Sequence, residues 1–197
     1  MLDDAVLFMH SIETRRLLLR PFKEDDGPAL HGVVGDDPDM TWDHSIRPVE
    51  MVSRTARDRM THFVKHGFGV WAVIEKATNT MVGQTGLQRL PNSESVELVT
   101  YTAKRVWRQG YSYEACRASL RYGFEVLGLD EIIAVVRKDN VAGRRVVGKL
   151  GFKYFRDDVI YEAEVEVSRL SKADFRVDLS ESYRVFPVQP QSAIAAQ

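Results

Sequence analysis

One segment, Glu97–Phe152, combines strand and helix patterns with two turn motifs and limits the possible folds most. A strand pattern leads into a turn with an isolated glycine, Gly110, and an amphipathic helix follows. Ile132–Val136 is continuously apolar, as expected for a strand covered on both faces, and a second helix ends at Gly151. This strand, helix, strand, helix order implies parallel pairing, so the sequence predicts a mixed α/β fold.

The rest of the chain supplies elements that fit around this segment. Strands are expected at Arg16–Phe22, Phe68–Lys76, Thr80–Leu90, Val96–Thr102 and Val159–Val167, and helices at Asp25–Val34 and Pro48–His66. Short polar turns join residues 68–102 into an antiparallel meander. At 197 residues the length favours one domain. Residues 176–197 lack periodicity and are expected to be a loose tail or an arm that contacts a partner, with a homodimer as one possibility.

The turn around Gly110 is expected to form an anion-binding site. The first N–H groups of a helix have no intrahelical acceptor, and the helix dipole favours negative charge at that end. The turn lacks the Gly-Lys-Ser/Thr of a nucleoside-triphosphate loop and the three glycines of a Rossmann turn. A different kind of phosphate group is therefore expected there.

Flanking residues identify the kind of turn. Six short groups of residues, spread over 56 positions, match one known pattern at the same spacings. They are Glu97-Leu98, Trp107, Gly110-Tyr111, Glu114-Ala115, Asp139-Asn140 and Lys149-Leu150-Gly151-Phe152. Upstream lies Glu13-Thr14-Arg15-Arg16-Leu17-Leu18-Leu19-Arg20-Pro21. This pattern resembles the GCN5-related N-acetyltransferases (GNAT), and within them the branch of the ribosomal-protein alanine acetyltransferases. The resemblance covers residues 12–175, which we take as the acyltransferase domain.

The resemblance implies a central mixed, mostly antiparallel sheet that is splayed in the middle, with helices on both faces. It also implies that acetyl-CoA binds in the splay as co-substrate. The acetyl group would pass directly to a primary amine, either a protein N-terminus or a small molecule. Cys116 falls on the apolar stripe of its helix, so we expect no covalent intermediate. A CoA-binding module without turnover and a scaffold or interaction protein stay open as alternatives.

The donor-binding residues follow from the same resemblance. The pyrophosphate is expected over the main-chain N–H groups of Gln109, Gly110, Tyr111, Ser112 and Tyr113. Ser112 replaces the small residue usual in the family. The pantetheine arm is expected to pair with the main chain of Tyr101, Thr102 and Ala103. Asn140 would contact the arm from the opposite lip and also cap its helix. The candidates for the 3′-phosphate are Arg144, Arg145 and Lys149.

For catalysis, the attacking amine must first lose its proton, because an alkylammonium has no free electron pair. Glu97 occupies the position of the family's base, although it could instead face solvent in a polar hairpin. Asp43 and His44 are rivals for this role. With Trp42 they belong to a loop that, by the resemblance, borders the acceptor.

The family's proton donors for the leaving thiolate are missing. The residues three and seven positions after Asn140 are Gly143 and Val147, and neither side chain can donate a proton. Solvent could protonate the thiolate, since the pKa of a thiol is only about 8.5. Another group could also do so, and the candidates are Tyr111, Tyr113 and Tyr154.

Charge and cysteine content exclude several classes of partner. Lysine plus arginine total 27 and aspartate plus glutamate 28, so no basic excess draws the chain to nucleic acid or an anionic membrane. The N-terminal residues lack the positive charge of a secretory signal, and a single cysteine cannot form an intrachain disulfide. We therefore expect a cytoplasmic protein, and we expect no metal site.

Overall fold

The computed structural model describes residues 9–91 and 93–188. The segment up to residue 8, in which no secretory signal was expected, and the end of the predicted tail, residues 189–197, lie outside the described residues. No helix in the described ranges is both long enough and apolar enough to cross a lipid bilayer.

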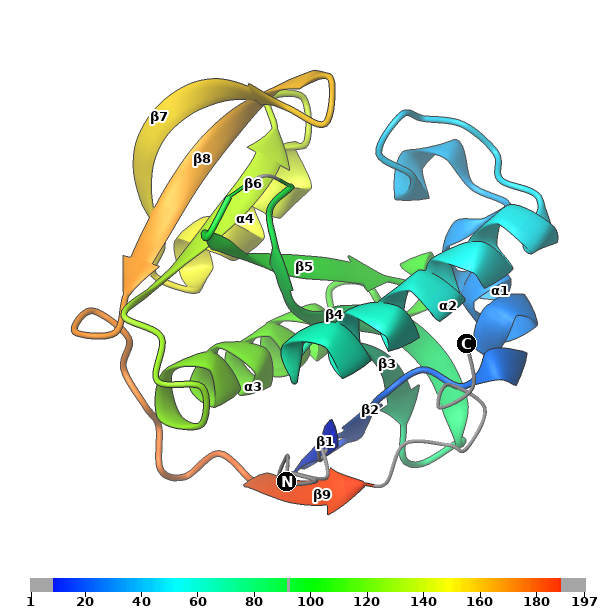
Figure 1. Ribbon diagram of the computed structural model, residues 1–197, viewed down its shortest axis with the longest axis horizontal. Helices are drawn as coiled ribbons and strands as arrows, with labels where there is room; N and C mark the ends of the chain where they lie inside the picture. Colours follow the sequence, from blue (N-terminus) through cyan, green and yellow to red (C-terminus); the bar gives the residue numbers. More distant parts are fainter. Residues whose placement is uncertain (1–8, 92, 189–197) are drawn as a thin grey trace, which may run out of the picture.

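The described chain is built on one nine-stranded open sheet in the order β7-β8-β6-β5-β4-β3-β2-β1-β9 (Figure 1). The strands are β1 Met9–Thr14, β2 Leu17–Arg20, β3 Val70–Glu75, β4 Thr80–Arg89, β5 Val96–Thr102, β6 Glu131–Arg137, β7 Lys153–Ile160, β8 Ala163–Ser171 and β9 Tyr183–Val188. Neighbouring strands are antiparallel except for β5 and β6, which are parallel. The predicted mixed, mostly antiparallel sheet is confirmed.

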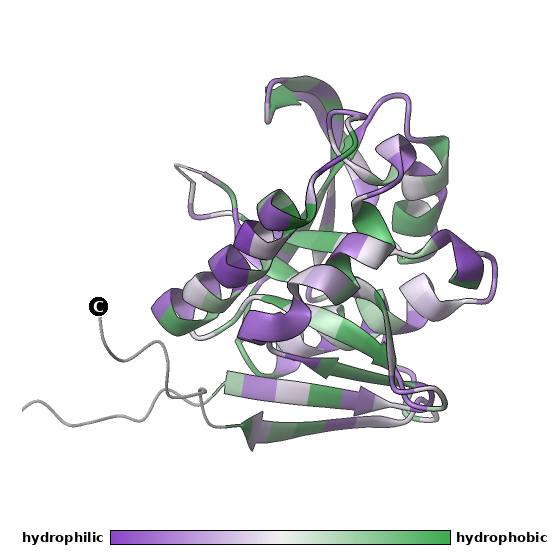
Figure 2. Ribbon diagram, turned by 90° about the vertical axis from the view of Figure 1, so that its right-hand side faces the viewer, coloured by the Kyte–Doolittle hydropathy of each residue, from purple (hydrophilic) through white to green (hydrophobic). Residues whose placement is uncertain are grey.

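Helices cover both faces of this sheet. They are α1 Gly27–Val34, α2 Val49–His66, α3 Tyr111–Glu125 and α4 Val141–Lys149. Arg59 of α2 contacts Gln88 of β4, whereas Cys116 of α3 lies 3.8 Å from Thr85 of the same strand. Strand residues an odd number apart point to opposite faces, so α2 and α3 lie on opposite sides. In Figure 2 the helices carry both purple and green positions, and the strands at the bottom edge of the sheet alternate between the two colours.

The α3 side of the sheet is closely packed. Leu87, Leu120, Ile132 and Cys116 have no exposed surface, which confirms the expected burial of the thiol. Gly123 permits this closeness, because a Cβ atom there would lie 2.7 Å from the side chain of Ile132. Burial of each large aliphatic side chain stabilises the fold by about 1.5–3 kcal/mol.

The sheet divides between β5 and β6. The two strands share a single register pair, Glu97 with Ile133, and then diverge. Figure 1 shows β6, β8 and β7 turning away from the other strands beyond this point. The splay expected from the family resemblance is therefore present, with Glu97 at its closed end.

The prediction of one strand over Val159–Val167 was wrong. The chain reverses at Tyr161 and Glu162, which have φ angles of 52° and 60° and join β7 to β8. Two-residue hairpins need such left-handed angles and usually take Asn or Gly there. Tyr-Glu carries no turn signal, so the alternating pattern continued through the turn unnoticed.

The prediction of a loose tail is wrong for Tyr183–Val188, because β9 pairs with β1 along its whole length. That this arm contacts a partner stays a prediction. Pro187 argued against a strand, yet it lies opposite His10 on the outermost strand of the sheet. An edge strand tolerates proline, since one of its sides needs no hydrogen-bond donor. Strand β1 itself was also missed.

Candidate active site

The glycine turn forms the N-terminus of α3. Gly110 is the N-cap residue, with φ of 79°, a left-handed conformation that glycine adopts without steric cost. The first intrahelical hydrogen bond runs from Glu114 N–H to the Gly110 carbonyl. The amides of the preceding residues therefore have no helical acceptor, as an anion cradle requires. The Ser112 hydroxyl lies 3.5 Å from that of Thr100 on β5.

An ion pair that the sequence did not reveal holds this turn in place. Arg16, between β1 and β2, donates from Nη1 to the Gln109 carbonyl and from Nε to Glu114 Oε2, at 2.9 and 2.6 Å. Thr14 also donates to Glu114, at 2.6 Å. Burial alone would raise the pKa of Glu114, but these hydrogen bonds outweigh it and lower the pKa. The first turn of α3 is thus fixed to the sheet.

Asn140 marks the opposite lip of the splay, at the start of α4. Its Oδ1 accepts a hydrogen bond from Gly143 N–H at 2.8 Å, so it is the N-cap residue. A Cβ atom at Gly143 would lie 2.7 Å from Asn140 Nδ2. The glycine therefore leaves room for the cap where the family often has a serine.

Two basic residues of α4, Arg144 and Lys149, have contacts within the protein. Arg144 donates to Glu166 Oε1 on β8 at 2.8 Å. The ammonium of Lys149 lies 4.6 Å from the centre of the Tyr113 ring, beside the cradle. Of these cations, Lys149 is the one seen to contact a cradle residue.

The end of β5 that was expected to receive the pantetheine arm has its own contacts. Ala103 N–H donates to Val82 O at 2.8 Å, and Trp107 Nε1 donates to Thr102 O at 2.7 Å. The Tyr101 side chain turns towards the α2 side, where burial raises its pKa. The Trp107 of the family pattern thus helps to fix the strand end next to the splay.

Glu97 is buried, with 3% of its surface exposed. Its Oε1 accepts hydrogen bonds from Gln88 Nε2 and from the hydroxyl of Tyr161. Burial raises the pKa of Glu97 above its ordinary value, although these hydrogen bonds and nearby Arg59 act in the opposite direction. The alternative of a solvent-facing hairpin residue is therefore excluded.

Of the three predicted acceptor-loop residues, Trp42 is the one seen to contact Tyr161, the hydrogen-bond partner of Glu97. The Trp42 indole donates to the Tyr161 carbonyl at 3.1 Å and meets the Tyr161 ring edge-on, with centroids 5.5 Å apart. Asp43 instead pairs with Ser45 and Arg47, which hold its pKa far below the usual range and make it a poor base. His44 lies 3.4 Å from Asp139, next to the Asn140 lip.

The tyrosines proposed as proton donors lie in different places. The Tyr111 hydroxyl bonds to Glu75, and that of Tyr154 bonds to Asp157 at 3.1 Å on the exposed side of β7. Val147 packs against the core. The tyrosine nearest the predicted base is Tyr161, which sequence reasoning missed because the hairpin turn was not recognised.

Comparison with known proteins shows the family to which the chain belongs. A family model described as an acetyltransferase (GNAT) domain matches residues 16–153. The Bacillus subtilis (strain 168) protein named Uncharacterized N-acetyltransferase YoaA is 28% identical over 147 residues, which cover 72% of this chain and 82% of that protein.

Two solved structures show a similar fold. The GNAT-family acetyltransferase from Bacillus anthracis has a TM-score of 0.71 at 21% identity, covering 83% of this chain and 99% of that one. RimL, a ribosomal L7/L12 alpha-N-protein acetyltransferase in complex with coenzyme A, has a TM-score of 0.65 at 15% identity, covering 81% and 98%. With a matching family model over more than half its length, the chain belongs to the GNAT family of acetyltransferases.

Proposed function

We propose that this enzyme transfers the acetyl group of acetyl-CoA to a primary amine by direct attack, within the splay between β5 and β6. The observation that carries the proposal is the separation of these strands after the Glu97 and Ile133 pair. The Gly110 turn stands at one lip and Asn140 at the other. A long anionic thioester fits such a site, with its pyrophosphate on the α3 amides and its arm along β5.

Glu97 is the proposed base. It would take a proton from the acceptor ammonium, directly or through a water molecule, so that the nitrogen pair can attack the thioester carbon. The new C–N bond forms as the C–S bond breaks, the sulfur leaves as a thiolate, and the nitrogen gives its second proton to solvent. A base works best when its pKa lies near the working pH, and burial moves the pKa of Glu97 in that direction.

Solvent is the proposed proton source for the thiolate. Gly143 and Val147 carry no acidic proton, and Tyr111 and Tyr154 bond to carboxylates of their own. Tyr113, whose ring lies against Lys149, stays an alternative donor. A thiol with a pKa of about 8.5 needs little help near neutral pH. The proposed acceptor is a primary amine, either of a small molecule or at a protein N-terminus. The name of the structurally similar RimL protein suggests the protein N-terminus.

The test is amine-dependent thiol release. The purified protein is incubated with acetyl-CoA and a panel of amino acids, polyamines and N-terminal peptides while free CoA thiol is followed. Release that requires both an amine and Glu97 supports the proposal. CoA binding by calorimetry without release for any amine would favour the module without turnover, and absence of CoA binding would favour a scaffold.

A further inference from the structure

A strip of polar side chains runs across the buried α2 side of the sheet. Gln84 lies opposite Tyr101, and Gln88 opposite Glu97, on the paired strands β4 and β5. Directly opposed residues share a face, and so do residues four apart along a strand. All four side chains therefore gather on the face that α2 covers. Gln84 and Glu97 are 4% and 3% exposed, so the strip reaches into the interior.

Arg59 of α2 places a guanidinium over this strip. Its Nη1 donates to Gln88 Oε1, and the Gln88 amide in turn donates to Glu97 at 2.5 Å. Its Nε is shielded from solvent and has no hydrogen-bond partner within the described part of the chain. None of the ion pairs formed among residues 9–91 and 93–188 includes Arg59.

This arrangement is costly unless a ligand completes it. A shielded N–H without a partner loses its hydration and gains nothing. The guanidinium also has no carboxylate in direct contact, because Gln88 stands between it and Glu97. Burial indeed lowers the pKa of Arg59. A purely structural link between α2 and β4 accounts for the bond to Gln88, but it leaves the Nε atom without a partner and the guanidinium without a directly bound carboxylate.

A second polar atom in the strip is also without a partner. Gln84 Oε1 is buried and accepts no hydrogen bond from a described residue. The strip thus offers a guanidinium without a directly bound carboxylate near the proposed base, and an acceptor without a partner further along β4. Gln88 bridges Arg59 and Glu97 through one amide group, so one small molecule could contact both charged groups.

We infer that Arg59 binds a carboxylate of the acceptor, so that the substrate is an amine carrying a nearby carboxylate, of the amino-acid type. This inference rests on the proposed acetyl transfer to an amine at Glu97. The planar guanidinium offers parallel N–H groups that match a carboxylate, and its charge would be neutralised on binding. The amine of the same molecule would then reach Glu97. Polyamines have no carboxylate, and the α-carboxyl of a protein's N-terminal residue is part of a peptide bond.

The test compares each L-amino acid with its α-amide, which keeps the amine and removes the carboxylate charge. We expect the wild-type enzyme to favour the acids in kcat/KM. Arg59→Met should lower kcat/KM for the acids by about 10- to 100-fold more than for the amides and spermidine, which share only the effect of Arg59 on the pKa of Glu97. Arg59→Lys, which keeps the charge but not the paired N–H groups, should lose less. The matched control is Arg57→Met on the exposed side of α2, which should change neither series.

The outcomes separate this inference from the proposed function. Equal losses for acids and amides in Arg59→Met, or a wild-type preference for amides or spermidine, would overturn the carboxylate site while leaving acetyl transfer intact. If no amine supports thiol release, the proposed function fails. Calorimetric titration of the same acids and amides into CoA-loaded protein then tests the carboxylate site without turnover. Weaker binding of the acids to Arg59→Met than to the wild type supports the site, and unchanged binding overturns it. Thermal melts of each variant exclude unfolding as the cause.

Discussion

The hydroxyl of Tyr161, in the turn between β7 and β8, donates a hydrogen bond to the carboxylate of Glu97 on β5. The two residues are 64 positions apart in the sequence, and the bond joins the two halves of the splayed sheet at its closed end. This contact makes the hairpin turn part of the proposed active site.

Replacing Tyr161 by Phe removes a hydrogen bond that lowers the pKa of Glu97. The pKa should rise further, and with it the acidic limb of the kcat profile, so that activity near neutral pH falls. A pH series of kcat measures the shift. Tyr154→Phe, which removes an exposed hydroxyl bonded to Asp157, serves as control and should leave the profile unchanged. An unshifted limb in Tyr161→Phe would show that this contact does not tune the base.

Glu97→Gln keeps the size of the side chain and removes the proton acceptor. Turnover should fall by about 10²- to 10⁴-fold, the usual contribution of a general base, while the affinity for CoA stays the same. The wild-type acidic limb should lie above the ordinary glutamate pKa, because burial raises it, and should disappear in the variant. Steady-state rates and calorimetry measure the two effects. Full activity in the variant would assign the base role to another group.

Gly110→Val should abolish donor binding. Space is not the obstacle, since the nearest atom to an added Cβ is Arg16 Nη2 at 3.5 Å. The φ of 79° is the obstacle, because a side chain with a branched Cβ would turn the amides away from the cradle. Gly128→Val is the control, as its φ is 70° with nothing near the Cβ. Both variants should lose stability, but only Gly110→Val should lose CoA affinity in calorimetry.

At Asn140, two substitutions separate capping from ligand contact. Asn140→Ala should destabilise the protein by about 1 kcal/mol through loss of the α4 cap, measured by denaturant unfolding. Asn140→Ser retains a capping oxygen and should keep most of that stability. If the amide also holds the pantetheine arm, both variants should bind CoA more weakly. Normal affinity in the serine variant would restrict Asn140 to capping.

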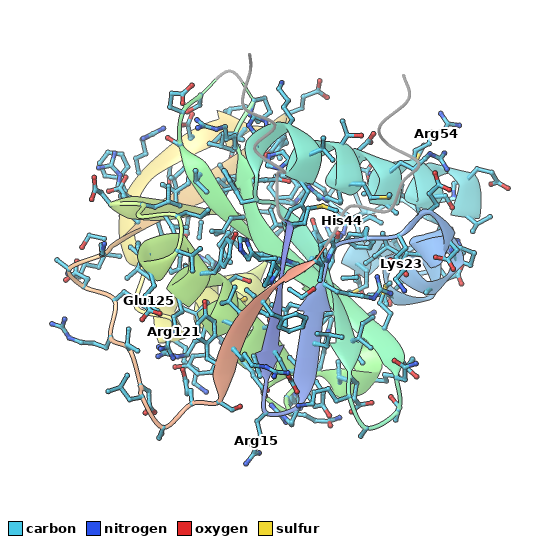
Figure 3. The ribbon with its side chains drawn as sticks, turned by 60° about the horizontal axis from the view of Figure 1, so that its bottom comes forward. Arg15, Lys23, His44, Arg54, Arg121 and Glu125 are labelled. Atoms are coloured by element: carbon cyan, nitrogen blue, oxygen red, sulfur yellow. The ribbon has the colours of Figure 1, made fainter. Side chains whose placement is uncertain are left out.

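Stability should depend on pH through Glu114. Its folded-state pKa is lowered, so its stabilisation is present above the unfolded pKa near 4.5 and is lost as the pH falls through the folded value. Glu114→Gln should cost about 1.5–3 kcal/mol at neutral pH and less in acid. Urea unfolding at several pH values measures this. Glu125→Gln, at an exposed pair with Arg121 on α3 (Figure 3), should cost well under 1 kcal/mol.

Much of this protein could be predicted from local sequence. The isolated glycine at 110, the apolar run of β6 and the Asn140 cap each express a short-range rule, namely a left-handed angle, burial on both faces and an orphan helix N–H. Those features place the splay and the cradle, because they depend only on residues near one another in the chain.

What the tertiary structure alone decided is which distant groups meet. The Tyr161 turn has no turn-forming residues, and β9 pairs with β1 despite Pro187, so neither was visible locally. Arg59 and Glu114 have no local sequence signal for their contacts, yet one lies over the strip beside Glu97 and the other anchors the Gly110 turn to Arg16. The energy of such contacts comes from burial and from partners far along the chain. A local sequence pattern predicts neither the burial nor the partners.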